Sequence, residues 1–444
     1  MPDLQEFIQQ LEEQNAPDSL YVSMVRQEAK ALSQLLEKNP SLLKRRVFQR
    51  LCLPDRVIEF KVSWTDDQGI PQVNRGWRVQ HSNVVGPYKG GLRFHPALGL
   101  STLKALAFEQ SFKNALTGLP IGGAKGGADF NPKGRSDAEI MRFCQAFMSE
   151  CYAEIGPNRD IPAGDINVGN REIGYLFGQY KTLTRQFEGA ITGKAGDFGG
   201  SQGRSEATGF GVIYFVEELL KSQDETLEGK VLAISGAGNV ALHAALKAIQ
   251  SDARVITLSN SRGLLVAENG LTEKQINWLL EQQQQLDNSL EEAAKEFDLQ
   301  YEKDSKPWQK NCDIALPCAT QNELNIEDLK QLKESDCLAI VEGSNMALTD
   351  EALNAIADSD LLFGPGKAAN AGGVAISTLE MTQNATFSPM TFDDVDQELQ
   401  RIMQAIFKRC MDNAPEDSDK PDLHKGASIA GFKILSAALL AQQG

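Results

Sequence analysis

Three lysines in the first third of the chain have the surroundings of a binding or catalytic site. Lys89 and Lys125 are each embedded in glycine, in GPYKGGLRFHP and GLPIGGAKGG, and Lys113 lies on the apolar helical stretch between them. Glycine lets a ligand approach the backbone closely. If the three ammonium groups share one pocket, repulsion and burial lower the pKa of at least one of them, which can then act as a base near neutral pH. The other cations would bind carboxylates, although a lysine taken singly is typical of a solvated surface.

Asp165, in IPAGDINVGN, has two interpretations. A carboxylate beside glycine and proline can act as a general acid, but local sequence alone favours a helix N-cap.

The sequence gives little support for phosphoryl transfer or for metal-dependent hydrolysis. GAITGKAG is one residue short of a Walker A loop and ends in alanine, and the four histidines lack metal-ligand spacing. These histidines are His81, His95, His243 and His424. The sequence therefore predicts no metal site.

A glycine turn between a strand and a helix is typical of dinucleotide binding. The stretch Gly236-Ala237-Gly238-Asn239-Val240-Ala241 directly follows VLAIS and directly precedes a helical pattern. Backbone N–H groups at such a helix start favour a pyrophosphate. A lone motif of this kind also serves packing alone, and it is the strand and helix around it that favour the cofactor interpretation.

The end of the next strand bears on the choice between NAD and NADP. An NAD site usually places Asp or Glu there to bind the ribose 2′-hydroxyl. This chain has Ser259, Asn260, Ser261 and Arg262 instead. With a hydroxyl and a guanidinium in place of a carboxylate, a 2′-phosphate is accommodated, so NADP is favoured and NAD stays possible. The alternative is a solvated turn with no ligand.

Composition limits the class of protein. A chain of 444 residues with 41% hydrophobic residues is globular and is expected to form two domains. The net charge of −16 argues against nucleic acid or an anionic membrane as a partner. Seven scattered cysteines without a C-x-x-C pair, and an acidic start without a signal peptide pattern, predict a cytoplasmic protein.

The order of patterns predicts an α/β fold of two domains. Residues 1 to about 50 have helical spacing, strands follow between 57 and 85, and from about 230 strands alternate with helices as in a parallel sheet. Residues 272–297 are expected to form a solvated helical insertion. We predict an N-terminal α/β substrate and oligomerisation domain over 1–200, joined by a returning C-terminal helix over 425–444, and a Rossmann-like dinucleotide-binding domain over 201–424.

Taken in order, the motifs resemble the glutamate dehydrogenase family, specifically the hexameric, NADP-preferring type of bacteria and fungi. The resemblance extends from about residue 50 to the C-terminus. It rests on seven blocks: PYKGGLRFHP (87–96), FEQSFKNALTGLPIGGAKGG (108–127), PAGDINVG (162–169), GGSQGRSEATGFGV (199–212), SGAGNVA (235–241), ALPCATQNEL (315–324) and GKAANAGGVAISTLEM (366–381).

The resemblance implies a role for each matching residue. Lys125 would activate the water that attacks an imine, and Asp165 would carry protons to and from the amino group. Lys89 and Ser377 would hold the substrate's side-chain carboxylate. The α-carboxylate would be held by Gln110 and Lys113. The rest of the substrate pocket would comprise Gly90, Thr192 and Asn370. The cofactor would be held by Thr208, Gly236, Gly238, Asn239, Val240, Ser261, Arg262 and Asn345.

The implied reaction is the reversible oxidative deamination of L-glutamate to 2-oxoglutarate and ammonium, with hydride transfer to NADP, in a homohexamer. Because water must be excluded during hydride transfer, a closing interdomain cleft is expected, with hinges near 193–203 and 364–373. The chain has Ala347-Leu348 where this family usually has Pro-Thr. The resemblance therefore does not predict the conformation of the loop near the nicotinamide. Two rivals are a leucine or phenylalanine dehydrogenase, which would lack a lysine for a distal carboxylate, and a non-catalytic oligomeric binding protein on the same scaffold.

Overall fold

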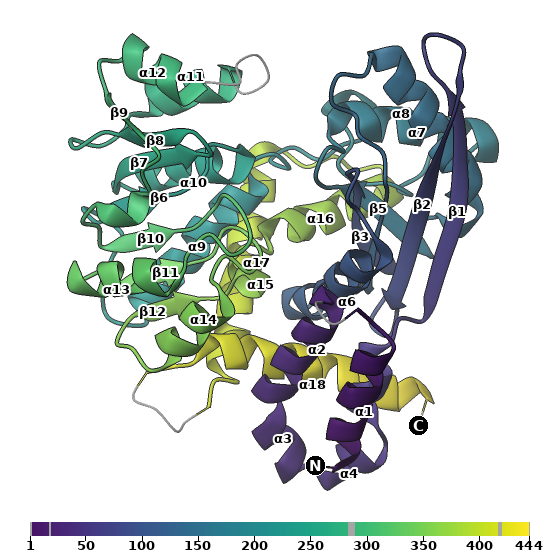
Figure 1. Cartoon of the computed structure of the whole chain (residues 1–444), viewed down its shortest axis with the longest axis horizontal. Coiled ribbons are helices and arrows are strands. Elements are labelled where there is room, and N and C mark those ends of the chain that lie inside the picture. The colour runs from purple at the N-terminus through teal and green to yellow at the C-terminus, as the bar shows by residue number, and fades with distance from the viewer. Residues whose placement is uncertain (1, 17–18, 283–288, 416–419, 444) are drawn as a thin grey trace. The chain divides into compact units, whose positions relative to one another are not determined.

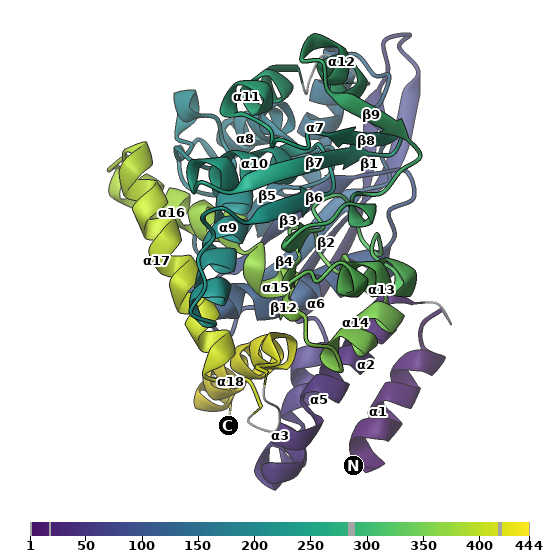
Figure 2. The same cartoon turned by 90° about the vertical axis from the view of Figure 1, so that its left-hand side faces the viewer.

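The chain forms two compact units. The computed structural model (Figures 1 and 2) describes residues 2–16, 19–282, 289–415 and 420–443. The first unit comprises residues 1–202, 376–395 and 428–444, and the second comprises residues 203–375 and 396–427. Among the described residues, none of the helices has both the length and the apolar character needed to span a bilayer.

A mixed five-stranded sheet is the centre of the first unit. Its strands follow the order β1-β2-β4-β3-β5, in which β2 is antiparallel to β1 and β4, and β3 is parallel to β4 and β5. The strands are β1 (Arg56–Thr65), β2 (Pro71–Ser82), β3 (Tyr88–Phe94), β4 (Gly123–Ala128) and β5 (Asp160–Gly164). The strands expected between 57 and 85 are confirmed as β1 and β2.

Strands β3 and β4 lie in glycine-rich segments that were not predicted to be strands, because glycine is depleted in strands generally. Here the glycines permit close packing of the sheet. A Cβ at Gly90 of β3 would lie 1.6 Å from the carbonyl oxygen of Ala124 in β4. Only glycine fits at this position.

Helices cover both faces of this sheet. Helix α6 (Leu100–Thr117) buries Leu103 against Trp77 and Val79 of β2. On the opposite face, α7 (Asp137–Cys151) and α8 (Asn170–Thr184) enclose an aromatic core with the side chains of alternate strand residues. Strand residues that alternate along the chain therefore face α6 or the α7–α8 pair.

The remaining helices of this unit come from both ends of the chain. The N-terminal segment is helical, as predicted, and α16, α17 and α18 begin or end in the second unit. Their bounds are α1 (Pro2–Glu13), α2 (Leu20–Ala31), α3 (Ser33–Lys38), α4 (Pro40–Lys44), α5 (Val47–Cys52), α16 (Gly372–Thr386), α17 (Phe392–Met411) and α18 (Leu423–Gln443). The return of the C-terminal helix to the first unit is confirmed.

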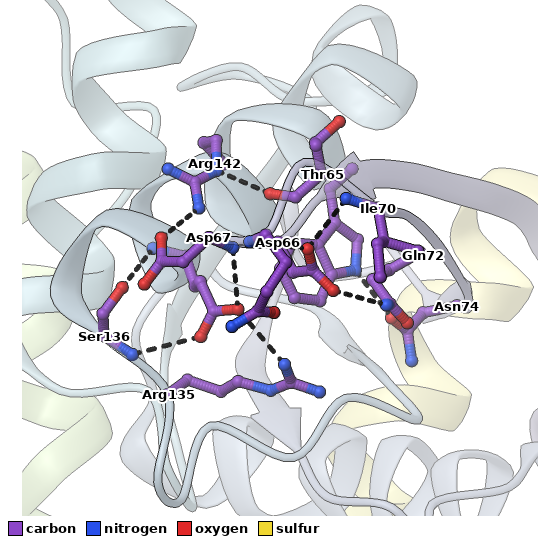
Figure 3. Close-up of polar contacts among 12 residues, drawn as sticks. Thr65, Asp66, Asp67, Ile70, Gln72, Asn74, Arg135, Ser136 and Arg142 are labelled. Atoms are coloured by element: carbon purple, nitrogen blue, oxygen red, sulfur yellow. Dashed lines mark hydrogen bonds and ion pairs between the residues drawn. The ribbon is translucent and has the colours of Figure 1, made fainter.

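The tip of the β1–β2 hairpin is fastened to the start of α7 (Figure 3). Asp66 accepts a hydrogen bond from the backbone N–H of Ile70 at 2.9 Å, which closes the turn. Arg142 of α7 donates to the carbonyl oxygen of Thr65 and to the carboxylate of Asp67, each at 2.6 Å. The tip of the hairpin is therefore held against α7 by these hydrogen bonds.

The second unit is built on a seven-stranded sheet of order β12-β11-β10-β6-β7-β8-β9. The first five strands in this order are parallel, while β8 and β9 are added antiparallel at one edge. The strands are β6 (Val231–Ile234), β7 (Arg254–Asn260), β8 (Gly263–Val266), β9 (Gln300–Lys303), β10 (Ile314–Leu316), β11 (Ala339–Val341) and β12 (Leu362–Gly364). The predicted Rossmann-like parallel sheet is confirmed, and the antiparallel edge was not foreseen.

Helices lie on both faces of this sheet as well. Helices α13 and α14 pack on the face that carries Ala233, Ala315 and Ile340, and α9 packs by Phe215 on the opposite face. The helices are α9 (Ala207–Lys221), α10 (Asn239–Gln250), α11 (Glu273–Gln282), α12 (Ser289–Glu296), α13 (Ile326–Glu334), α14 (Asp350–Ala357) and α15 (Gly366–Ala369). Helices α11 and α12 confirm a helical insertion, of which residues 283–288 lie outside the described part.

Candidate active site

The register of the first sheet brings the three lysines to one side. Lys125 of β4 pairs with Val79, which faces α6. Leu92 pairs with Gly126, and because side chains alternate, Lys89 points to the same face as Lys125. Lys113 lies on α6, the helix that covers this face, and all three lysines are buried. The fold therefore places Lys89 and Lys125 on the sheet face that is covered by α6, the helix that carries Lys113.

Lys125 and Asp165 form an ion pair at the end of the parallel strands. Lys125 Nζ lies 3.1 Å from Asp165 Oδ1, and Asp165 directly follows β5. Arg93 of β3 donates from Nε to Asp165 Oδ2 at 2.6 Å. Burial alone would raise the pKa of Asp165, but the charges of Lys125 and Arg93 outweigh it and lower this pKa to about 2. Asp165 is therefore a carboxylate at neutral pH, bound to two cations, and it does not cap a helix.

Lys89 is among the most buried side chains of the protein, with 1% of its surface exposed. Its Nζ donates to Thr192 Oγ1 at 2.6 Å, and Thr192 is fixed by a backbone bond from its N–H to the Pro162 carbonyl at 3.0 Å. The backbone carbonyl of Gly90 accepts a hydrogen bond from buried Arg78 at 3.0 Å. Lys89, Gly90 and Thr192, which were predicted for the same substrate pocket, thus lie together on β3 and the segment beside β5.

Gln110 and Lys113 are one turn apart on α6. Gln110 Nε2 donates to Asn114 Oδ1 at 2.6 Å, and Asn114 in turn donates to the carbonyl oxygen of Lys89 at 3.2 Å. This chain of contacts ties the α6 residues to the strand that carries Lys89. Ser377, on α16, is 2% exposed and belongs to the same unit.

Residues near Ser377 and Thr192 are joined by a buried ion pair that was not predicted. Glu380, one turn after Ser377, accepts hydrogen bonds from Lys194 Nζ at 2.6 Å and from the backbone N–H of Gly193 at 2.8 Å. Both charged side chains are fully buried. This pair therefore fixes the segment that carries Thr192 relative to the helix that carries Ser377.

The predicted pyrophosphate turn has the expected geometry. Gly236 adopts φ +87° and its N–H donates to Ser259 Oγ at 3.1 Å. Gly238 is the N-cap of α10, and a Cβ built on it meets nothing within 4 Å. Asn239 begins the helix, is exposed, and donates to the Ser205 carbonyl at 2.6 Å. Open space above exposed N–H groups at a helix start suits the pyrophosphate of a dinucleotide.

The other predicted cofactor residues lie around this turn in the second unit. Val240 continues α10, and Thr208 lies in the first turn of α9, which packs on α10. Ser261 and Arg262 are exposed in the β7–β8 turn. This turn is closed by Asn260, whose side-chain oxygen accepts from the N–H of Arg262 at 2.9 Å. The turn geometry suits a ligand and a solvated surface equally well.

Asn370 lies in the second unit, together with a predicted cofactor residue. Its Nδ2 donates to Asn345 Oδ1 at 2.7 Å and to the Gly343 carbonyl at 3.2 Å, while its own Oδ1 is buried without a protein hydrogen-bond partner. Asn370 thus belongs to a different unit from the other predicted substrate residues, and its place in their pocket stays a prediction. Ala347 and Leu348, where the chain departs from the family pattern, are buried in the core.

Sequence reasoning did not single out Arg93, Lys194 or Glu380. Arg93 lies in the same block as Lys89, and Glu380 in the same block as Ser377, so proximity to those residues was the available signal. Within the described residues, no group of three or more His, Cys, Asp or Glu side chains is arranged to hold a metal ion.

One unit has the glycine turn and parallel sheet of a dinucleotide-binding fold, and the other has buried lysines and a Lys–Asp ion pair, which are the parts expected of a dehydrogenase that acts on amino acids. The sequence matches the model of Glutamate/Leucine/Phenylalanine/Valine dehydrogenase over residues 199–443, and that of the Glu/Leu/Phe/Val dehydrogenase dimerisation domain over residues 54–182. The chain belongs to this family of oxidoreductases. The family resemblance predicted from the motifs is confirmed.

Several similar proteins carry one activity in their names. The chain is 48% identical over 438 residues to the NADP-specific glutamate dehydrogenase of Psychrobacter sp., with 98% of each chain covered. It is 47% identical over 422 residues to the NAD(P)-specific glutamate dehydrogenase of Xylanibacter ruminicola, with 95% of each covered. The crystal structure of Plasmodium falciparum glutamate dehydrogenase superposes with a TM-score of 0.97 at 43% identity, covering 100% of this chain and 95% of that one.

Proposed function

We propose that this chain is a glutamate dehydrogenase that interconverts L-glutamate with 2-oxoglutarate and ammonium and prefers NADP. One observation carries the proposal: the Lys125–Asp165 ion pair, 3.1 Å long, lies on the same sheet face as buried Lys89. A lysine amine and a carboxylate, here Lys125 and Asp165, can exchange protons with the amino group of a substrate. A second buried cation on that face serves an anionic substrate, which an acidic chain does not otherwise attract.

The substrate would be held by its two carboxylates. Lys89 and Ser377 would bind the distal carboxylate, and Gln110 and Lys113 the α-carboxylate. An ammonium group as buried as that of Lys89 interacts more favourably with a carboxylate than with a neutral group, because both charges are then compensated. Gly90, Thr192 and Asn370 would complete the pocket. A dicarboxylate is therefore preferred over an amino acid with an apolar side chain.

The reaction divides into hydride transfer and imine hydrolysis. When bound, NADP supplies the acceptor for the hydride that leaves the α-carbon. Asp165 would take a proton from the substrate amino group, which becomes the imine nitrogen as the α-carbon is oxidised. Lys125, after its ammonium group has given a proton to solvent, would then accept a proton from water as the oxygen bonds to the imine carbon. Asp165 would return its proton to nitrogen, and the C–N bond would break as the new hydroxyl group gives its proton to the departing amine, so that ammonium and the 2-oxo acid are released.

Turnover of competing substrates tests the proposal. NADPH oxidation is followed with ammonium and either 2-oxoglutarate or a branched 2-oxo acid such as 2-oxoisocaproate. Strong preference for 2-oxoglutarate is expected, and equal or better turnover of the branched acid favours a leucine dehydrogenase. Absence of turnover with every acid favours the non-catalytic rival, against which the presence of both Lys125 and Asp165 argues.

Lys89 is the residue on which substrate choice is proposed to depend. Lys89→Leu is expected to lose most of its activity with 2-oxoglutarate, and Lys133→Leu, which changes an exposed lysine of the same unit, is the matched control. Full activity of Lys89→Leu with 2-oxoglutarate would remove the stated cause of specificity.

NADP preference is proposed from the end of β7. No carboxylate lies among Ser259, Asn260, Ser261 and Arg262 to repel a 2′-phosphate, and the last two are exposed. Similar proteins are named NADP-specific, NAD(P)-specific and NAD-specific, so use of NAD stays possible. Comparison of kcat/KM for NADPH and NADH at saturating 2-oxoglutarate and ammonium decides between strict and dual use.

We also propose a cytoplasmic homohexamer. Residues 54–182 match a dimerisation domain, and large apolar side chains such as Val73 and Phe387 are 65% and 84% exposed in the single chain, which favours burial against other copies. The seven cysteines are all free thiols, as expected in a reducing compartment. Light scattering coupled to gel filtration tests the assembly. A single-chain mass of 48.5 kDa at micromolar concentration would contradict it.

A further inference from the structure

We propose that Arg93 is a positioning residue that holds the Asp165 carboxylate toward Lys125 for proton transfer. The proposal rests on the proposed dehydrogenase function, in which Asp165 carries the proton of the substrate amine. No role was assigned to Arg93 by the motifs, although it lies four residues after Lys89 on β3.

The two carboxylate oxygens of Asp165 have different partners. Arg93 Nε donates to Oδ2 at 2.6 Å, and Lys125 Nζ lies 3.1 Å from Oδ1. A carboxylate held at both oxygens by cations from neighbouring strands cannot rotate about its Cβ–Cγ bond without breaking one contact. Oδ1 is therefore kept next to Lys125. Arg93 and Asp165 are each about one-fifth exposed, so their contact is partly shielded from water.

Arg93 is not required to hold the loop on which Asp165 lies. The backbone N–H of Phe94 donates to the Ile166 carbonyl at 3.1 Å, and Asn167 Nδ2 donates to the Phe94 carbonyl at 2.9 Å. Within the loop, the N–H of Val168 donates to the Asp165 carbonyl at 2.9 Å. Since these bonds fix the backbone, the guanidinium acts on the carboxylate itself. Arg93 is therefore not needed to hold the backbone of this loop in place.

The charges around Asp165 support this assignment. The charged side chains that contact it among the described residues are Arg93 from β3 and Lys125 from β4. On α8, the next element along the chain, Arg171 pairs with Glu172. Lys125 and Arg93 keep the pKa of Asp165 low, although burial alone would raise it. Without Arg93, Lys125 alone would orient the carboxylate and both oxygens would be free to approach its ammonium group.

The test compares Arg93→Met and Arg93→Lys with the intact enzyme. Misplacement of a catalytic group by about 1 Å costs on the order of 100-fold in rate, so kcat of Arg93→Met is expected to fall about 10- to 100-fold, with KM for 2-oxoglutarate within about twofold. Arg93→Lys retains a cation and is expected to recover part of the loss. Arg75→Met removes an exposed arginine that pairs with Asp129 on the same sheet and serves as the control, with unchanged kcat.

A double-mutant cycle separates positioning from a structural effect. In an Asp165→Asn background, Arg93→Met is expected to change kcat by less than about twofold, because the group through which Arg93 acts is already neutral. Single turnovers, with enzyme in excess over NADPH, keep slow variants measurable. An equal fall in both backgrounds, or full activity of Arg93→Met, overturns the proposal. If Arg93→Met does not fold, the same comparison is made with Arg93→Lys. Failure of the proposed function is recognised separately, because the intact enzyme would then not turn over 2-oxoglutarate.

Discussion

Lys194 Nζ lies 2.6 Å from Glu380 Oε1, and both side chains are completely buried. Lys194 also donates to the Ile191 carbonyl and lies over the ring of Phe177, so its ammonium group is enclosed by acceptors and an aromatic face. Glu380 receives the N–H of Gly193 in addition. A buried pair that is satisfied so fully is tolerated in the interior, whereas either charge alone is not.

Lys194→Met is therefore expected to destabilise the first unit strongly. It leaves the Glu380 carboxylate buried without its cation, and losses of this kind cost about 3–5 kcal/mol. The measurement is urea-induced unfolding followed by tryptophan fluorescence, in which the midpoint should fall. Added Glu380→Gln keeps an acceptor for the Gly193 N–H and removes the uncompensated charge, so the double variant should recover part of the loss.

The control for this prediction is an exposed pair. Lys221 and Glu218 are 3.9 Å apart, and the lysine is 76% exposed. Lys221→Met is expected to change the midpoint little, because surface ion pairs contribute about 0–1 kcal/mol. Equal effects of Lys194→Met and Lys221→Met would contradict the importance given to burial.

Substitution of the two glycines of the pyrophosphate turn, Gly236 and Gly238, is expected to have different effects. Gly236→Ala places a side chain at φ +87° and 3.0 Å from the Cys318 carbonyl, so it strains the turn and lowers stability. Gly238→Ala meets open space and leaves stability unchanged, but its methyl group occupies the volume through which a pyrophosphate approaches the backbone. KM for NADPH should then rise about tenfold or more, a loss of about 1.4 kcal/mol of binding. Thermal unfolding and NADPH titration distinguish the two variants, and unchanged NADPH binding by Gly238→Ala would place the dinucleotide elsewhere.

The sequence predicted the second unit better than the first. The hydrophobic periods of the sequence identify β6, α10 and β7, because each strand and helix of this parallel sheet is a continuous segment with its own period. Strands β3 and β4 escaped prediction because their glycines serve interstrand approach and carry no hydrophobic period.

The composition of the candidate site was predictable only in part. The shared face of Lys89 and Lys125 follows from strand register, which spacing along the chain does not contain. The contact between Arg93 and Asp165 joins residues 72 positions apart, and that between Lys194 and Glu380 joins residues 186 positions apart. Such contacts have no local signal in a single sequence.

His81 is expected to make the first unit sensitive to acid. Its ring is buried, with Nε2 donating to the Cys52 carbonyl at 3.1 Å and Nδ1 accepting from Ser111 Oγ at 2.9 Å. Burial lowers the pKa of His81 to about 4. Between pH 6.5 and 4 the unfolded chain therefore binds a proton that the folded protein does not, and stability falls as the pH is lowered. The contribution at pH 5 is about 2 kcal/mol.

The measurement is urea unfolding at pH 7 and pH 5 for the intact protein, His81→Gln and His95→Gln. The His81 variant should be less stable at pH 7 but should lose less stability between the two pH values. His95 is exposed, so its variant should follow the intact protein. An identical pH dependence of all three proteins would show that His81 does not control the acid response.

Asn260→Asp is expected to reverse the cofactor preference. The Asn260 side-chain oxygen accepts from the backbone N–H of Arg262 at 2.9 Å and of Gly263 at 3.2 Å, and an aspartate oxygen accepts both equally well. The turn is therefore retained while a negative charge is placed at the end of β7, where it accepts the ribose 2′-hydroxyl of NAD and repels the 2′-phosphate of NADP. The ratio of kcat/KM for NADPH to that for NADH should fall about tenfold or more, mainly through a higher KM for NADPH. Asn269→Asp adds the same charge at another exposed turn of this unit and should leave the ratio unchanged. A ratio unaffected by Asn260→Asp, in a variant that still folds and binds NADH, would remove the β7 turn from cofactor discrimination and leave the preference without its proposed cause.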